Sequence, residues 1–169
     1  MRRLLAALAL ALCGCAVKVP EGIKPVEGFE LDRYLGEWYE IARLDHRFER
    51  GLSKVTAEYS MRADGGVRVL NRGYSAEKGG WKEAEGRAYF TGDPSVGGLK
   101  VSFFGPFYGG YNIIELGREN YAWALVCGPD RSYLWILART PELAPETLEK
   151  LKARAAELGF PVPELIFPG

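Results

Sequence analysis

The sequence contains little cysteine, a single histidine and no net charge. Its 169 residues include three cysteines, and 22 Lys and Arg balance 22 Asp and Glu. Without a basic stripe or a phosphate-binding glycine loop, the chain is a poor candidate for binding nucleic acid. His46 is the only histidine, and it has no second histidine or suitably spaced carboxylates to share a metal with. We therefore predict no metal site and no cofactor.

Long hydrophobic runs are also scarce, and the one at the N-terminus is too short to cross a bilayer. Residues 4–12 follow two arginines and lead into Leu12-Cys13-Gly14-Cys15, a pattern typical of an export signal. The glycine before Cys15 resembles the lipobox of bacterial lipoproteins, in which the chain is cut before the cysteine and the cysteine is acylated. We predict a lipoprotein signal peptide at 1–14, a lipidated N-terminus and tether at 15–30, and lipidation of Cys15. An ordinary signal peptide that leaves Cys15 a free thiol is the alternative.

The shortage of cysteine leaves no predicted disulfide. Once Cys13 is removed with the signal and Cys15 carries lipid, Cys127 has no partner. Stability in an exported protein of this kind must then come from packing. A lone cysteine in a strand is more often a small wall residue than a nucleophile, so we expect Cys127 to be structural.

Short segments in which apolar and polar residues alternate make up most of the chain. This period of two is typical of half-buried strands, and clusters of turn-forming residues separate the segments. Eight strands are expected, at residues 36–44, 53–62, 67–74, 83–90, 99–104, 111–116, 121–127 and 133–139. We predict an all-β fold: an eight-stranded antiparallel up-and-down β-barrel, or calyx, whose interior holds one small ligand.

After Arg139 the period changes to that of a helix. Apolar residues recur at spacings of three and four between Pro145 and Gly159, which predicts one amphipathic C-terminal α-helix. We expect it to be packed on the outside of the barrel, because its single apolar stripe must be buried. The wall residues expected beneath it are Leu134, Ile136 and Ala138. A role at a membrane surface is the alternative, although the mixed charge of the helix disfavours it.

One end of the barrel is predicted from the two ends of the domain. Gly36-Glu37-Trp38 opens the first strand and Arg139 follows the last. An indole pointing down the axis, with a guanidinium across its face, closes a small barrel by burying area and by a cation–π contact. Gly36, Trp38 and Arg139 are therefore the predicted closed end.

These end motifs resemble those of the lipocalins. The closing run is Tyr133-Leu134-Trp135-Ile136-Leu137-Ala138-Arg139-Thr140-Pro141. Three further runs, at 45–51, 101–112 and 124–131, resemble the bacterial outer-membrane lipocalin lipoproteins in particular, and the resemblance predicts a lipocalin domain at 31–169. One departure is that Gly117-Arg118-Glu119-Asn120-Tyr121 stands where other lipocalins have Thr-Asp-Tyr.

The resemblance implies a function as a lipid carrier. Its expected ligands are fatty acids, such as palmitate, or lysophospholipids, used in envelope maintenance or in lipid storage and transport. It also implies anchoring in the outer membrane through acylated Cys15, with the protein facing the periplasm, and no enzymatic activity. Two alternatives remain open: a lipocalin-fold enzyme that acts on a bound lipid through Cys127 or through Glu40 and a tyrosine, and an envelope scaffold with an unoccupied barrel.

Alternation along each strand, phased by an inward Trp38, predicts an apolar lumen with a few polar points. It also turns Ala42 inward. An acidic side chain in such a lumen is costly unless it is paired, so we expect Glu40 to meet a cation there, with an arginine as the candidate. The predicted ligand-binding residues are Glu40, Ala57, Tyr59, Val69, Asn71, Ala88, Phe90, Phe103, Tyr111, Ile113, Val126, Tyr133 and Trp135.

Strand order also predicts the mouth. If the first strand starts at the closed end, every second loop lies at the opening, where we expect His46, Phe48, Phe107, Tyr108 and Asp130. His46 is interpreted as a solvated or hydrogen-bonded rim residue. The fifth and sixth strands are apolar on both faces, which leaves their phase open. An exposed apolar wall would suit a homodimer, with contacts expected at Phe104, Trp123 and Leu125.

Overall fold

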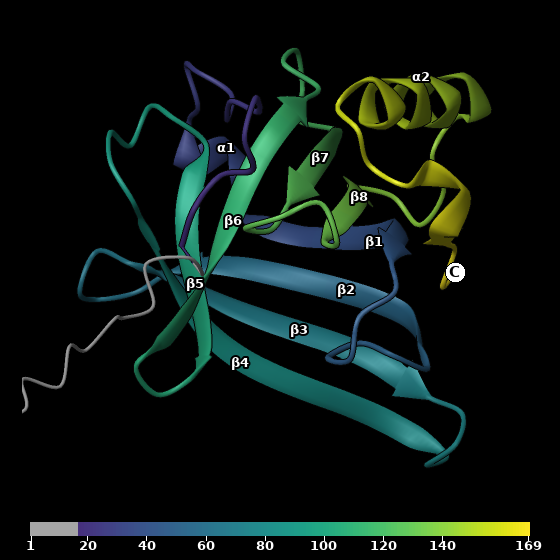
Figure 1. Ribbon diagram of the computed structural model, residues 1–169. Helices are drawn as coiled ribbons and strands as arrows, with labels where there is room; N and C mark the ends of the chain where they lie inside the picture. The colour runs from purple at the N-terminus through teal and green to yellow at the C-terminus, as the bar shows by residue number, and fades with distance from the viewer. Residues whose placement is uncertain (1–16) are drawn as a thin grey trace, which may run out of the picture.

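Eight antiparallel strands follow one another along the chain, and the first strand pairs with both the second and the eighth (Figure 1). The structure, a computed structural model, describes residues 17–169. The strands are β1 (Gly36–Leu44), β2 (Leu52–Met61), β3 (Val67–Ser75), β4 (Gly80–Phe90), β5 (Gly98–Phe104), β6 (Phe107–Leu116), β7 (Trp123–Cys127) and β8 (Leu134–Ala138). Because β1 pairs with both β2 and β8, the sheet closes on itself as a barrel. This confirms the predicted eight-stranded fold.

Two strands begin at places that the turn residues did not predict. β6 starts at Phe107 because Gly105, at φ 49°, makes a tight turn that pairs Phe104 with Phe107. Gly109 and Gly110, which precede the strand expected at 111–116, lie inside this strand. β7 starts only at Trp123, because Tyr121 has a left-handed backbone (φ 52°) and its amide donates to the Gly117 carbonyl.

Two β-bulges change which side chains face the lumen. Between Glu40 and Ala42 the register of β1 against β8 shifts by one residue, since a bulge places two residues opposite one. The prediction for Ala42 is therefore wrong: it faces outward and packs under the C-terminal helix, whereas Arg43 turns inward. A second bulge, between Ile113 and Glu115 of β6, turns Ile114 and Glu115 outward and Leu116 inward, which resolves the phase of this strand.

The helix α2 (Pro145–Glu157) lies on the outer wall, as predicted (Figure 1). Pro145 occupies its first turn, where no backbone donor is needed, and Gly159 ends it at φ 83°. Its buried stripe, Leu151 and Ala155, packs against wall residues that include Leu134 and Ile136.

The expected homodimer contact at Leu125 is wrong, because α2 buries that residue. Leu125 is fully buried in the cluster between the wall and the helix, and Trp123 is half-buried against the same cluster. A residue covered by its own chain cannot contact a second copy. Phe104, the third expected contact, is exposed at the β5–β6 turn.

Three short elements complete the barrel. The helix α1 (Leu31–Tyr34) lies across the end where β1 begins. After α2, a 3₁₀ turn (Val162–Glu164) leads to β9 (Leu165–Ile166), which pairs with the last residues of β1. Residues 17–30, expected as part of a tether, pack against the barrel: Ile23 is buried in the cluster under α2, and Phe29 is buried in the interior cluster.

Candidate functional site

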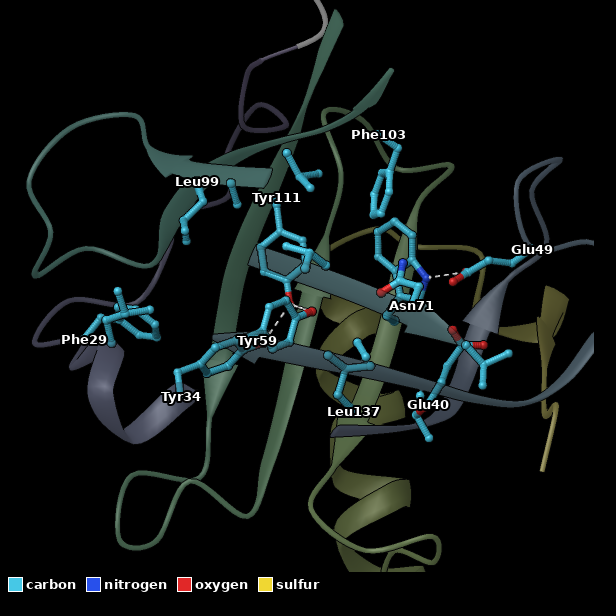
Figure 2. Close-up of a pocket in the computed structure, with 18 residues that line it drawn as sticks. Phe29, Tyr34, Glu40, Glu49, Tyr59, Asn71, Leu99, Phe103, Tyr111 and Leu137 are labelled. Carbon is cyan, nitrogen blue, oxygen red and sulfur yellow. Dashed lines mark hydrogen bonds between the residues drawn. The ribbon is translucent and has the colours of Figure 1, made fainter. Parts of the chain in front are cut away.

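A cavity of about 110 Å³ lies inside the barrel (Figure 2). Most of its lining is aliphatic or aromatic, with polar groups at a few points. Small side chains such as Ala57 and Ala88 leave the space that the larger ones border. The lining residues are Phe29, Leu31, Tyr34, Glu40, Glu49, Val55, Thr56, Ala57, Tyr59, Val69, Asn71, Ala88, Leu99, Val101, Phe103, Tyr111, Trp135 and Leu137.

Nine of the thirteen predicted ligand-binding residues line this cavity. They are Glu40, Ala57, Tyr59, Val69, Asn71, Ala88, Phe103, Tyr111 and Trp135. Phe90, Ile113 and Val126 pack in the interior core instead. Tyr133 is half-buried beside the cavity, where its ring stacks on Trp135 with 6.1 Å between centroids. Whether any of these residues contacts a ligand stays a prediction.

Several lining residues could not be predicted from strand alternation. Phe29, Leu31 and Tyr34 precede the first strand, and Glu49 belongs to the β1–β2 loop, so no strand alternation could place them. Thr56 follows a bulge near Lys54, which has φ 50°. Leu99 could have been found, since it shares the strand parity of the inward Phe103.

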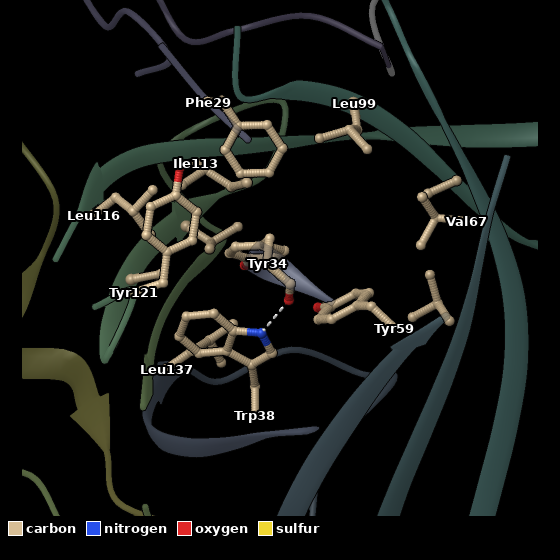
Figure 3. Close-up of a cluster of buried hydrophobic side chains, with 14 residues drawn as sticks. Phe29, Tyr34, Trp38, Tyr59, Val67, Leu99, Ile113, Leu116, Tyr121 and Leu137 are labelled. Atoms are coloured by element: carbon tan, nitrogen blue, oxygen red, sulfur yellow. Dashed lines mark hydrogen bonds between the residues drawn. The ribbon is translucent and has the colours of Figure 1, made fainter. Parts of the chain in front are cut away.

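The closed end is made by Trp38 and the groups around it (Figure 3). Trp38 is fully buried, its indole N–H donates to the Tyr34 carbonyl at 2.8 Å, and the guanidinium carbon of Arg139 lies 3.9 Å from its ring centre. Gly36 has φ 96°, and a side chain there would lie 3.4 Å from the same guanidinium. Tyr121 adds a contact at this end, since its hydroxyl accepts from the amide of Glu30.

Three tyrosine hydroxyls meet in the cavity wall. Tyr111 lies between the other two, with its oxygen 2.7 Å from that of Tyr34 and 2.8 Å from that of Tyr59 (Figure 2). Burial raises the pKa of each hydroxyl, so all three stay neutral. Three O–H groups that make two mutual hydrogen bonds retain one proton for another acceptor.

A buried charged cluster occupies the other side of the cavity. Glu40 is paired with Arg43 at 2.6 Å, which is the arginine partner that we expected for it. Arg43 reaches the lumen because of the bulge in β1, and its other nitrogen donates to the carbonyls of Glu49 and Leu52. The pair is almost fully buried, so its charges depend on each other and on these hydrogen bonds.

Glu49 connects this pair to the mouth. Its carboxylate lies 2.8 Å from Nε2 of His46 and accepts the indole N–H of Trp135 at 3.0 Å. Burial and the neighbouring Glu49 raise the pKa of Glu40 to about 8, although Arg43 opposes that shift. Burial also acts to raise the pKa of Glu49, but hydrogen bonds from His46 and Trp135 lower it overall. Of the two carboxylates, Glu40 is therefore the one whose pKa is raised.

The five predicted rim residues belong to loops or strand ends at the open end, and they differ in exposure. Phe48 and Phe107 are 57% and 73% exposed, and Asp130 is exposed too. His46 is buried, with Nε2 2.8 Å from the Glu49 carboxylate, so the solvated interpretation does not describe it. Tyr108 is half-buried, and its hydroxyl accepts from Arg87.

The remaining predicted residues lie away from the cavity. Cys127 is fully buried on the outer face, and burial raises the pKa of its thiol to about 12. Cys15 and the predicted signal peptide lie outside the described residues. Within residues 17–169, no three His, Cys, Asp or Glu side chains gather as metal ligands would. No helix of that part of the chain is long and apolar enough to span a bilayer.

Comparisons with known proteins agree with this geometry. The model of the lipocalin-like domain matches residues 29–169. A Vibrio cholerae protein named outer membrane lipoprotein Blc is 56% identical over 167 residues, which cover 99% of this chain and 98% of that protein. The Escherichia coli K12 protein of that name is 60% identical over 148 residues, 88% of this chain and 83% of its own.

More distant relatives and solved structures match as well. Bovine apolipoprotein D is 35% identical over 136 residues, which cover 75% of this chain and 69% of that protein. Insecticyanin from the tobacco hornworm Manduca sexta has a TM-score of 0.71 at 21% identity, covering 90% of this chain and 86% of that chain. This last likeness shows the fold alone.

Proposed function

Because the chain belongs to the lipocalin family, we propose that it is a carrier that holds the hydrocarbon tail of a fatty acid or lysophospholipid inside its barrel. It is an outer membrane lipoprotein, like the relatives that are 56% to 61% identical to it over 148 to 167 residues. Acylated Cys15 would hold it there, facing the periplasm. Its role would be envelope maintenance or lipid storage and transport.

The observation that carries this proposal is the apolar cavity closed at one end by Trp38. Each methylene moved from water into such a lining contributes about 0.8 kcal/mol. Ten to sixteen of them contribute roughly 8–13 kcal/mol, which outweighs a cost of about 4–8 kcal/mol for immobilising the ligand. A hydrocarbon tail therefore supplies the free energy of binding, and polar groups need only orient it.

Two sets of polar groups are available for a head group. The tyrosine hydroxyls offer a neutral donor, and Asn71 Oδ1 is a buried acceptor without a hydrogen-bond partner among residues 17–169. The second set is the cluster of Glu40, Arg43 and Glu49. Both sets favour a ligand that has hydroxyl or carbonyl groups at one end of an apolar tail.

The size of the cavity adds a requirement. A volume of about 110 Å³ is smaller than the 150 Å³ cavity that accepts benzene, so a long tail can enter only if lining side chains move. Phe103 and Trp135 are half-buried aromatic residues of the lining, and their rings could move to enlarge the cavity. We expect both rings to turn aside when a ligand binds.

Fluorescence titration tests the carrier function. In a Trp81→Phe background, which removes the exposed indole, palmitate or lysophospholipid should quench Trp135 saturably and leave the lipid unchanged. Trp135→Phe is the control that identifies the quenched residue. Saturable binding followed by a new lipid product would favour the enzyme instead, and Cys127→Ser would then show whether the thiol takes part. If no lipid quenched Trp135 saturably, the carrier function would be rejected in favour of an envelope scaffold with an unoccupied barrel.

Native mass spectrometry tests the anchor in the same preparation. Protein extracted from membranes with detergent should show the mass of a diacylated and N-acylated Cys15 as its first residue. A Cys15→Ser variant should lose both that mass and membrane attachment. A mature chain that begins elsewhere, with a free thiol at Cys15, would contradict the lipoprotein assignment. The same spectrum reports the oligomeric state and any bound lipid.

A further inference from the structure

Large hydrophobic side chains are exposed at one end of the barrel. Seven are exposed among the described residues, and only Met61, at the last position of β2, lies at the closed end. Four others form what we call the rim patch, on the β1–β2, β3–β4 and β5–β6 connections: Phe48, Trp81, Phe104 and Phe107. The last two, Ile166 and Phe167, lie beside the mouth end of β1. Single exposed apolar residues are ordinary, but a gathering at one end indicates an interaction surface.

Basic side chains accompany the rim patch. The guanidinium of Arg47 lies 4.8 Å from the ring centre of Phe48, and Nζ of Lys100 lies 4.9 Å from that of Tyr108. Further exposed basic residues in or next to these loops are Arg50, Lys54, Lys78 and Lys82. The acidic residues exposed there include Asp45, which is paired with Arg50, together with Glu77 and Asp130. Aromatic rings interleaved with Lys and Arg suit the headgroup layer of an anionic bilayer.

The described chain begins on the same half of the barrel. The carbonyl of Lys18 accepts from Asn112, and a side chain at Gly110 would lie 2.7 Å from it. The carbonyl of Glu21 accepts from Arg131 in the β7–β8 loop at 2.8 Å. From there the segment runs toward the closed end, where the amide of Glu30 meets Tyr121. Residue 17 is thus on the half of β6 nearest to the mouth.

Covalent geometry then limits how far a lipid on Cys15 can lie from the mouth. Only Ala16 separates Cys15 from Val17, and two steps along the backbone span at most about 7 Å. Gly110 is three residues along β6 from Phe107, roughly 10 Å. A lipid on Cys15 is therefore tethered within about 7 Å of residue 17, on the half of β6 nearest to the mouth.

We propose that the rim patch lies on the surface of the bilayer that holds the anchor, so that the barrel opens onto the membrane and lipid passes between them without crossing water. This inference rests on the proposed function for the anchor and for the cargo. The rings would contribute by inserting at the level of the headgroups, and the basic side chains by attraction to anionic lipid.

Quenching by brominated lipid tests this orientation on the acylated full-length mature protein. In vesicles of phosphatidylethanolamine and phosphatidylglycerol with brominated acyl chains, Trp81 should shift to shorter wavelength and lose emission, read as the difference from Trp81→Phe. The matched control is Met61→Trp in the Trp81→Phe background, an exposed indole at the closed end whose emission should not change. Replacing Phe104 and Phe107 by serine together should reduce the quenching of Trp81 and slow the transfer of lipid out of vesicles.

Three results would overturn the inference. The first is equal quenching at positions 61 and 81, and the second is no quenching at either position. The third is concentration-dependent crosslinking through the rim patch that excludes lipid. Such crosslinking would assign the patch to a second copy of the chain. Titration of Trp135 with lipid in solution separates failure of the proposed orientation from failure of the carrier function. Lipid binding with an unquenched Trp81 rejects only the orientation, whereas a quenched Trp81 without lipid binding rejects only the carrier.

Discussion

The guanidinium of Arg139 lies over the indole of Trp38 and also ties together the backbone of the closed end. Its nitrogens donate to the carbonyls of Glu37 and Arg33, at 2.9 and 2.7 Å. One side chain from the end of β8 therefore holds the beginning of β1 and the helix α1. This contact joins the two ends of the domain where the barrel closes.

Replacing Arg139 by alanine should lower the free energy of unfolding by about 2–3 kcal/mol. The change removes a cation–π contact, worth about 0.5–2 kcal/mol, and hydrogen bonds worth about 1 kcal/mol each. Urea denaturation measures it. Arg72→Ala, which removes only an exposed pair with Glu83, is the control and should change stability by about 0.5 kcal/mol or less. Equal losses in the two variants would remove the special role of Arg139.

The stability of the protein should depend on pH through Glu40. Its pKa in the folded protein, about 8, lies above the ordinary 4.5, so the folded state binds this proton more tightly than the unfolded chain does. That contribution is fully present below the unfolded pKa and is lost as the pH rises through about 8. Between roughly pH 5 and pH 9, the wild type should lose on the order of 4 kcal/mol relative to Glu40→Gln. Parallel pH profiles from thermal unfolding would contradict the shift.

Filling the cavity should weaken lipid binding. Ala57 lines the cavity next to Trp38 in the register of β1 and β2. A phenyl ring at this position occupies the space that a tail would take, and we expect Ala57→Phe to reduce palmitate affinity about tenfold, or about 1.4 kcal/mol. Ala63→Phe, in the exposed β2–β3 turn, is the matched control and should bind normally. Trp135 titration gives both affinities.

Emptying the cavity should have the opposite effect. Phe103 is half-buried in the lining and packs against Gly86, whose absent side chain leaves room for the ring. Because Phe103→Ala removes a ring that a long tail must displace, its affinity for long chains should rise severalfold relative to short ones. Phe104→Ala changes the neighbouring residue, which is 69% exposed. Identical chain-length profiles in the two variants would show that Phe103 does not limit the cavity.

The fold was predictable because strands leave a regular trace in the sequence. Alternation located eight strands and a change of period located α2, since burial of one face imposes each pattern. The closed end was predictable for a different reason. Trp38 and Arg139 are large, and their contact depends only on where the barrel starts and ends.

Much of the cavity wall could not be predicted, because bulges interrupt alternation without any marker in the sequence. One extra residue in β1 turned Ala42 outward and Arg43 inward, and it thereby supplied the partner of Glu40. Glu49 and Tyr34 reach the cavity from segments that have no strand period. Leu125 was misjudged because the apolar outer wall of β7 is covered by α2 and not by another molecule.

The row of phenols formed by Tyr34, Tyr111 and Tyr59 has a consequence for the choice of cargo. Each hydroxyl can rotate, so the row can be polarised toward either end and can present a hydrogen or a lone pair to whatever lies beside it. A protonated acid, an ester and an alcohol can thus be accommodated by the same three residues. On the proposed function, this adaptability would let one barrel accept lipids with different head groups.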